Sequence, residues 1–260
     1  MTVTKVQTAR AEHTTDTVRI IVTAVCEAFA VFSLIRFSLE SSFTNIFLSL
    51  ATVFLVLIPV LIEKVFHCRI ATAVYVWASL YAVGPLLGEA NQLYFILPWW
   101  DKLLHCCGGM AFALAGYYIP ELLNKGKPVS RTMRIVFAVC FSVAVAALWE
   151  FYEFGGDRLF GTDMQQDRYV TTVNSYFLAD SYGVVGTLGK IESVGINGEE
   201  IPGYIDIGLI DTMGDMMIET FGAILAAAFF VWDKERHPII CPALDKNAQT
   251  NRSDVVCQPD

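Results

Sequence analysis

Ionisable side chains with helical spacing interrupt three of the apolar segments of this chain. Each group follows the i, i+3, i+4 pattern that places side chains on one face of a helix. Acidic or imidazole groups within such segments are costly to bury, and they mark sites or pathways by default. In chain order the residues are Asp101 and His105, then Glu150, Glu153 and Asp157, then Asp211, Asp215 and Glu219.

Seven carboxylates gathered with one imidazole would form an oxygen-rich site. So many acids close together cannot all stay ionised unless some are protonated, paired or bound to a cation. Oxygen ligands with a single histidine suit a hard or borderline divalent ion, namely Mg²⁺, Mn²⁺ or Zn²⁺. We therefore predict that all eight residues are metal ligands, with His105, Glu150 and Glu153 also as catalytic acid–base groups.

Structural explanations compete with this chemistry at several positions. Asp101 and Asp211 also suit the start of a helix, where a carboxylate meets unpaired backbone N–H groups. His105 alone would often be a packed core histidine, and Glu27 lies within an apolar segment with no partner evident in the sequence. Residues 106 and 107, both cysteine, point about 100° apart on a helix, which favours packing over metal binding.

Composition indicates the elements that must position these groups. The 260 residues are 55% hydrophobic and 17% charged, with a mean hydropathy of +0.50. These values exclude a disordered chain, a nucleic-acid-binding module and an ordinary soluble enzyme. A membrane span needs about 20 apolar residues. We predict an all-α polytopic membrane protein with six transmembrane helices, near 18–37, 43–62, 70–87, 103–122, 133–154 and 210–232.

Lysine and arginine in the connections predict the orientation. Connections 38–42 and 88–100 contain neither residue. Both termini are therefore expected in the cytoplasm of a plasma or inner membrane, with tails at 1–17 and 233–260 around a membrane domain at 18–232. The basic residues on the expected cytoplasmic side are Lys5, Arg10, Arg19, Lys64, Arg69, Lys125, Lys127, Arg131, Arg134, Lys234 and Arg236.

The fifth connection, 155–209, is unusually long for a compact bundle. It holds eight acidic and three basic residues, so it supplies five of the eight net negative charges. Short β-branched stretches lie near 169–173 and 183–194, and Asn197–Gly198 after them is a hairpin turn signal. We predict a small β-hairpin lid outside the membrane.

Several familiar motifs are absent from the sequence. It contains no HExxH, GxSxG, P-loop or GxGxxG pattern. The seven cysteines lack CxxC spacing, which argues against a disulfide framework and a zinc ribbon. These absences leave a carboxylate-based site as the main chemical signal.

The same residues resemble the YjdF-like family of uncharacterised bacterial membrane proteins. The resemblance spans roughly residues 20–232 and departs only at 163–209, where many relatives have a short link. It implies the membrane fold and the location of a site, but no reaction. A weaker resemblance connects the Asp-Lys-x-x-His helix to VanZ-like proteins, which are linked to glycopeptide resistance. The matching motifs are Asp101-Lys102…His105…Gly109, Trp149-Glu150…Glu153, Gly161-Thr162, Asp211-Thr212…Asp215-Met216 and Gly222-Ala223.

Three functions compete on these grounds. The first is a metal-dependent enzyme at the outer face, acting on a lipid-linked or envelope substrate amid membrane lipids, with no nucleic-acid partner. The second is a proton- or cation-coupled transporter with Glu27 in its relay. The third is a scaffold whose acids join helices to one another. Shallow, convergent polar stripes favour the enzyme.

Overall fold

The computed structural model describes residues 2–124, 127–233 and 239–242. Lys125, Lys234, Arg236 and Cys257, with most of the expected tail at 233–260, lie outside the described residues. The chain divides into two compact units, Met1–Ala111 with Ala227–Asp260 and Phe112–Ala226.

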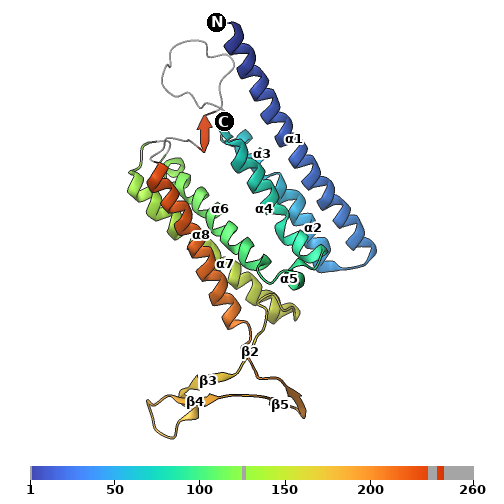
Figure 1. The fold of residues 1–260 in the computed structure, drawn as a ribbon, viewed down its shortest axis with the longest axis vertical. Helices are drawn as coiled ribbons and strands as arrows, with labels where there is room; N and C mark the ends of the chain where they lie inside the picture. Colours follow the sequence, from blue (N-terminus) through green and yellow to red (C-terminus); the bar gives the residue numbers. More distant parts are fainter. Residues whose placement is uncertain (1, 125–126, 234–238, 243–260) are drawn as a thin grey trace. The chain divides into compact units, whose positions relative to one another are not determined.

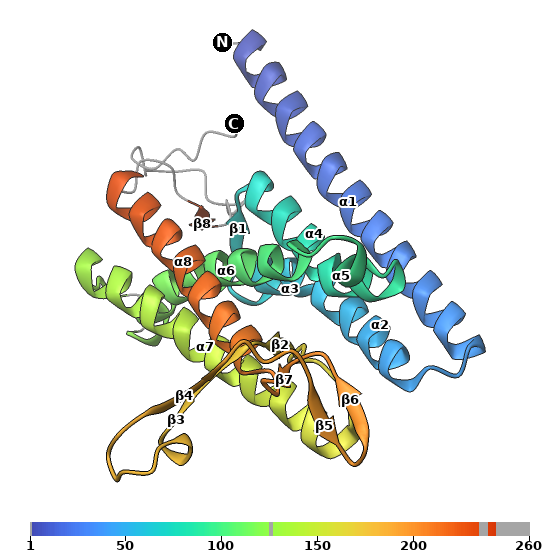
Figure 2. The same cartoon turned by 60° about the horizontal axis from the view of Figure 1, so that its bottom comes forward.

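The first unit is a set of helices (Figure 1) that also contains one small two-stranded sheet, whose strands are labelled β1 and β8 in Figure 2. Helices α1, α2 and α4 pack on one another. Their contacts bury small and aliphatic side chains, among them Ala30, Val56 and Leu86, none of which retains any exposed surface. The helices are α1 Thr2–Leu39, α2 Phe43–Val56, α3 Ile58–Val65, α4 Thr72–Ala90, α5 Leu93–Ile96 and α6 Trp100–Leu123, which continues into the second unit.

The segment predicted as one span at 43–62 consists of two helices. Helix α2 ends at Val56, and α3 begins at Ile58 with Pro59 in its first turn. Proline has no backbone N–H and its ring collides with the carbonyl four residues earlier, so a continuous helix is interrupted here. The two pieces together still form an apolar stretch, Asn45–Val65, long enough to cross a membrane.

A two-stranded sheet joins distant parts of the chain within the first unit. Strand β1 (Cys68–Ile70) pairs antiparallel with β8 (Ile240–Pro242), and Arg69 lies opposite Cys241. Arg19 of α1 reaches the same place: it pairs with Glu63 at 2.7 Å and donates to the carbonyl of Ile70. The start of the α1 span and both strands therefore meet at one end of this unit.

The second unit contains α7 (Arg131–Phe160) and most of α8 (Leu209–Asp233). Helix α7 continues six residues beyond the predicted span end at 154, so the connection begins after Phe160 and not at 155. Glycines 155 and 156 are accommodated within the helix. Gly161, at φ +65°, ends it in the left-handed conformation that glycine adopts most easily.

Short antiparallel strand pairs fill the connection between α7 and α8 (Figure 2). Pair β2–β7 lies next to the helix ends, and pairs β3–β4 and β5–β6 extend from it in different directions. Residues 197 and 198, both at positive φ, link β5 to β6. The strands are β2 Tyr169–Val170, β3 Thr172–Ser175, β4 Gly186–Gly189, β5 Val194–Ile196, β6 Glu199–Ile201 and β7 Tyr204–Ile205, with a 3-10 turn at Tyr176–Leu178.

Five helical stretches of the described chain are long and apolar enough to cross a membrane, which confirms a mostly helical protein with several candidate spans. The third predicted span, 70–87, is a helix, α4, but falls outside these five. Its Tyr, Trp, Ser, Gly and Pro residues lower its mean hydropathy, and Pro85 lies within it. The five stretches are Thr15–Leu39, Asn45–Val65, Trp100–Leu123, Arg131–Phe160 and Leu209–Asp233.

Candidate functional site

Asp101 and His105 lie in the first two turns of α6, in the first unit. The Trp100 indole donates to the carbonyl of Gly84 at 3.3 Å, so the beginning of α6 is fixed against α4. His105 Nε2 lies 3.7 Å from Asp101 Oδ1, and Lys102 Nζ lies 3.1 Å from Asp101 Oδ2. A carboxylate beside an imidazole can fix the orientation of the ring, as in many metal and acid–base sites.

Glu150 and Glu153 lie on the buried face of α7, in the second unit. Glu150 is 4% exposed and Glu153 is 8% exposed. The Trp149 indole donates to Glu153 Oε1 at 2.8 Å, which holds that carboxylate in place. Two buried glutamates one turn apart are not a solvated charged face, while their catalytic and metal-binding roles stay a prediction.

Asp157 has a different environment from the other acids of α7. Its Oδ1 accepts bonds from the Thr162 hydroxyl at 2.8 Å and the Met164 N–H at 2.7 Å, and its Oδ2 accepts the Gln165 N–H at 3.0 Å. Both oxygens are therefore occupied in holding the beginning of the connection against the end of the helix. This arrangement favours a positioning role for Asp157 over the metal-ligand role that the sequence predicted.

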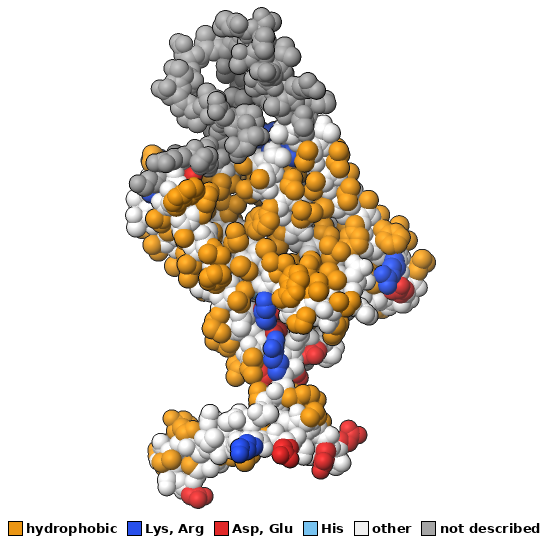
Figure 3. Space-filling view, in the orientation of Figure 1, with side chains coloured by type: hydrophobic (Ala, Val, Ile, Leu, Met, Phe, Trp, Pro, Cys, Tyr) orange, Lys and Arg blue, Asp and Glu red, His pale blue; other side chains and the backbone are white. Residues whose placement is uncertain are grey.

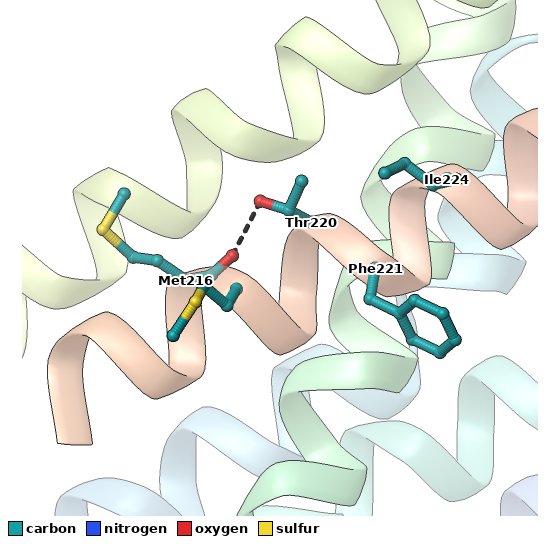
Figure 4. A pocket seen from close by; sticks show the side chains of 5 residues that line it. Met216, Thr220, Phe221 and Ile224 are labelled. Atoms are coloured by element: carbon teal, nitrogen blue, oxygen red, sulfur yellow. Dashed lines mark hydrogen bonds between the residues drawn. The ribbon is translucent and has the colours of Figure 1, made fainter. Parts of the chain in front are cut away.

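The three acids of α8 lie on its interior face. Asp211, Asp215 and Glu219 retain 2%, 1% and 4% of their exposed surface. The opposite face carries a shallow hollow of about 260 Å³, where the Thr220 hydroxyl donates to the Met216 carbonyl at 2.7 Å (Figure 4). At about 100° of rotation per residue, the residues that line this hollow lie on average about half a turn around the helix axis from the three acids. The hollow is therefore separate from the acidic stripe.

Asp211 forms an ion pair with the connection. Its Oδ1 lies 3.4 Å from Arg168 Nη2. Asp211 is in the first turn of α8, where it also interacts favourably with the positive helix end. The side chain that caps the helix is Asp206, because its Oδ2 accepts the Ile210 N–H at 2.9 Å and its Oδ1 accepts the Arg168 N–H at 2.8 Å.

The sequence interpretation missed Asp206 and Gln165. An aspartate followed by Gly208 just before an apolar helix is a helix-start signal that could have identified Asp206. Gln165 had no such signal. It is 9% exposed, and its side chain donates to the Thr212 hydroxyl at 2.5 Å while its N–H binds Asp157. Gln165 thus links the end of α7 to the first turn of α8.

Asp167 lies among acidic neighbours in the same stretch. Partial desolvation raises the pKa of its carboxyl, and the charges of Asp163, Asp206 and Asp157 raise it further, while Arg158 opposes them. Its N–H donates to Asp163 Oδ1 at 3.1 Å. The stretch 162–168 is consequently both a link between helix ends and a concentration of negative charge.

Within the second unit, the structure brings the ends of α7 and α8 together through residues 162–168. Glu150 and Glu153 lie deeper along α7, and Asp215 and Glu219 lie deeper along α8. Asp101 and His105 belong to the first unit. A joint site of all eight residues therefore stays a prediction.

Comparison with known proteins identifies the family. Residues 18–236 match the family model described as "Predicted membrane protein (DUF2238)", so the chain belongs to this family of membrane proteins of unknown function. The expected relation to an uncharacterised membrane family is thereby confirmed, whereas the comparisons do not show a relation to VanZ-like proteins. No curated protein and no solved structure matches the chain.

Proposed function

We propose that this protein is a membrane-embedded, metal-dependent enzyme acting on a lipid-linked or envelope substrate. The observation that carries the proposal is the burial of Glu150, Glu153, Asp215 and Glu219 on two helices that are apolar enough to cross a membrane. Connectivity places these acids toward the linked ends of α7 and α8. Burying a carboxylate costs free energy, and proteins retain buried carboxylates mainly where these groups bind cations or move protons.

In this proposal His105 and Asp101 join those four acids as ligands of Mg²⁺, Mn²⁺ or Zn²⁺. A bound divalent ion supplies an activated water or holds a phosphate group. Glu150, Glu153 or His105 would accept and return the proton, as predicted from the sequence. Asp157 and Asp211 are supporting groups here, because their oxygens contact the connection.

We also propose six spans, with α4 as the sixth and both termini in the cytoplasm. The pairing of β1 with β8 supports this topology, because paired strands lie on one side of the membrane. Two segments on the same side must be separated by an even number of crossings. Helices α6, α7 and α8 account for three crossings, so α4 must supply the fourth. The basic residues of the connections then favour the cytoplasmic side for both strands.

Glu27 favours a second candidate function, a proton- or cation-coupled transporter. Its Oε1 is buried, with no hydrogen-bond partner in the part of the chain that the structure describes. A carboxyl group within a span is a common component of proton pathways. Against this candidate, most of the remaining acids lie toward one end of their helices, and only Glu219 lies near the middle of α8, whereas transporters place their sites at the midplane.

Metal content of the detergent-purified full chain tests the proposal. The variants are Glu150→Gln, Asp215→Asn and His105→Gln, each assayed after incubation with Mg²⁺, Mn²⁺ or Zn²⁺ and removal of free ion. Glu200→Gln is the control, because it removes one exposed carboxylate from the connection. Gel filtration and thermal unfolding establish that each variant remains folded.

The proposal expects a stoichiometric divalent ion in the wild type and in Glu200→Gln, and its loss from the other three variants. A protein that binds no ion under any of these conditions contradicts the metal-dependent enzyme. Glu27→Gln in a proton-flux assay would then test the transporter. If the substitutions lower only thermal stability, the acids join helices and the scaffold function is favoured.

A further inference from the structure

The β3–β4 pair and the turn between its strands form an arm, residues 172–189, with an apolar end. Six large side chains of this end, called the arm patch, are at least 45% exposed. Phe177 retains 99% of its exposed surface, so it contacts almost nothing in the described chain. Isolated exposed apolar residues are ordinary, but contiguous ones mark an interaction surface. The arm patch consists of Tyr176, Phe177, Leu178, Tyr182, Val184 and Val185.

The backbone of the arm holds these side chains outward. Strands β3 and β4 pair from Thr172 opposite Gly189 to Ser175 opposite Gly186. The Ser175 hydroxyl accepts the Phe177 N–H at 3.1 Å, which starts the 3-10 turn. Gly186 lies so close to the Leu178 carbonyl that no side chain would fit there. The backbone structure of the arm therefore keeps the arm patch exposed.

The arm starts near the level of the lipid headgroups. Helix α7 has 30 residues, or about 45 Å at 1.5 Å per residue, which is about the thickness of a bilayer with its headgroups. Its final turns expose Leu159 and Phe160 at 78% and 80%. The apolar surface of this span thus continues to the residues from which the connection departs.

Charge distinguishes the two arms of the connection. Among residues 172–189 the sequence has a single charged residue, Asp180. The β5–β6 pair instead carries Glu199 and Glu200, both exposed. Figure 3 shows hydrophobic side chains and one acidic group toward the end of one arm, and several acidic groups toward the end of the other. Aromatic and aliphatic residues with little charge are the composition that prefers the membrane–water interface.

We infer that the arm patch inserts into the interface of the bilayer on the side where α7 ends, and so anchors the connection to the lipid surface. The partner is the headgroup–acyl boundary of phospholipids, bound through aromatic rings and aliphatic groups and not through charge. This inference depends on α7 and α8 crossing the membrane, and it is independent of any metal.

Lipid-based fluorescence quenching of the full chain in vesicles tests this inference. An environment-sensitive fluorescent amino acid replaces Phe177 in one protein and Asn197, in the turn between β5 and β6, in the other. Both proteins are reconstituted in phosphatidylcholine vesicles with and without doxyl-labelled lipid. Aqueous iodide provides the complementary quencher.

We expect doxyl lipid to quench the probe at 177 several-fold more than the probe at 197, with iodide showing the opposite order. Equal doxyl quenching at both positions would overturn the inference. A second result would also overturn it: neither quencher reaches the probe at 177, but iodide does once the protein is diluted with more lipid. That result would indicate that the arm patch contacts another copy of the chain.

Discussion

Arg168 Nη2 lies 3.4 Å from Asp211 Oδ1 and thereby joins the long connection to the first turn of α8. The two partners differ in environment, because the Asp211 side chain is 2% exposed and the Arg168 side chain 50%. The carboxylate thus lies inside the unit while its cation remains half in water. Solvent weakens such a pair, but it does not remove the need to compensate the buried charge.

The Arg168–Asp211 pair can be measured by a double-mutant cycle. Arg168→Gln and Asp211→Asn, alone and combined, should show a coupling energy of about 1 kcal/mol, the upper range for a partly exposed pair. The measurement is the free energy of reversible unfolding in mixed detergent micelles. Strictly additive single effects would mean that the pair contributes nothing to stability.

Asp157→Ala should release residues 162–165 from the end of α7. Three hydrogen bonds to a carboxylate are lost, and each such bond contributes about 1.5–3 kcal/mol where it is protected from water. Hydrogen exchange at the Met164 and Gln165 amides should accelerate accordingly. Asp163→Ala is the control, because that carboxylate is exposed and accepts the N–H of Asp167, so it does not hold residues 162–165. Unchanged exchange with loss of a bound metal would instead make Asp157 a ligand.

Gly208→Ala should be more damaging than Gly161→Ala, although both glycines have positive φ. The left-handed conformation costs a residue with a Cβ about 1–2 kcal/mol at either position. At Gly161 the new Cβ meets nothing within 4 Å, whereas at Gly208 it lies 2.6 Å from Gln165 Cβ. Thermal unfolding should therefore show a larger loss for Gly208→Ala. Equal losses would show that Gln165 moves aside without cost.

Arg69→Cys should form a disulfide with the native Cys241 under mild oxidation. The two residues are opposite each other in the β1–β8 pair, and paired antiparallel strands bring Cα atoms within the range that a disulfide spans. The product is detected by its mobility before and after reduction. Arg69→Cys in a Cys241→Ser background should not form it. If Arg69→Cys with the native Cys241 also forms no disulfide, the β1–β8 pairing is contradicted. The proposal that α4 crosses the membrane then loses its support.

The stability of the connection should fall as pH rises through the range above the ordinary aspartate pKa. The pKa of Asp167 is raised in the folded protein, so the folded state holds a proton that the unfolded chain has already released. Folding is then favoured at low pH, and this contribution is lost as pH passes the raised value. Limited proteolysis between α7 and α8 across this range measures the effect. Asp167→Asn should flatten the profile.

Helical spacing predicted the burial of the acids well. The patterns at Glu150–Glu153 and Asp211–Asp215–Glu219 depend on a period of 3.6 residues, which local sequence reports directly. The environment of Asp157 could not be predicted in this way, because it depends on how the backbone turns after Gly161. The hydrogen bonds of Asp157 join it to residues beyond the end of the helix, and the periodicity of the helix gives no information about their positions.

The limits of the helices were harder to predict than their existence. Glycines at 155 and 156 suggested a loop, yet α7 passes through them, because each costs only about 1 kcal/mol in a long helix. Proline had both outcomes: Pro59 separates α2 from α3, while Pro85 is accommodated within α4. The residue type alone therefore did not determine where each helix ends.

The β1–β8 pairing also bears on the order of synthesis. The ribosome delivers β1 before α4, but its partner strand follows α8, so the hydrogen bonds of β1 wait for almost the whole remaining chain. The first unit, made from both ends of the sequence, is consequently the last to be completed. A chain halted before residue 240 would enter the membrane with a bare strand edge, which is a template for pairing with another protein.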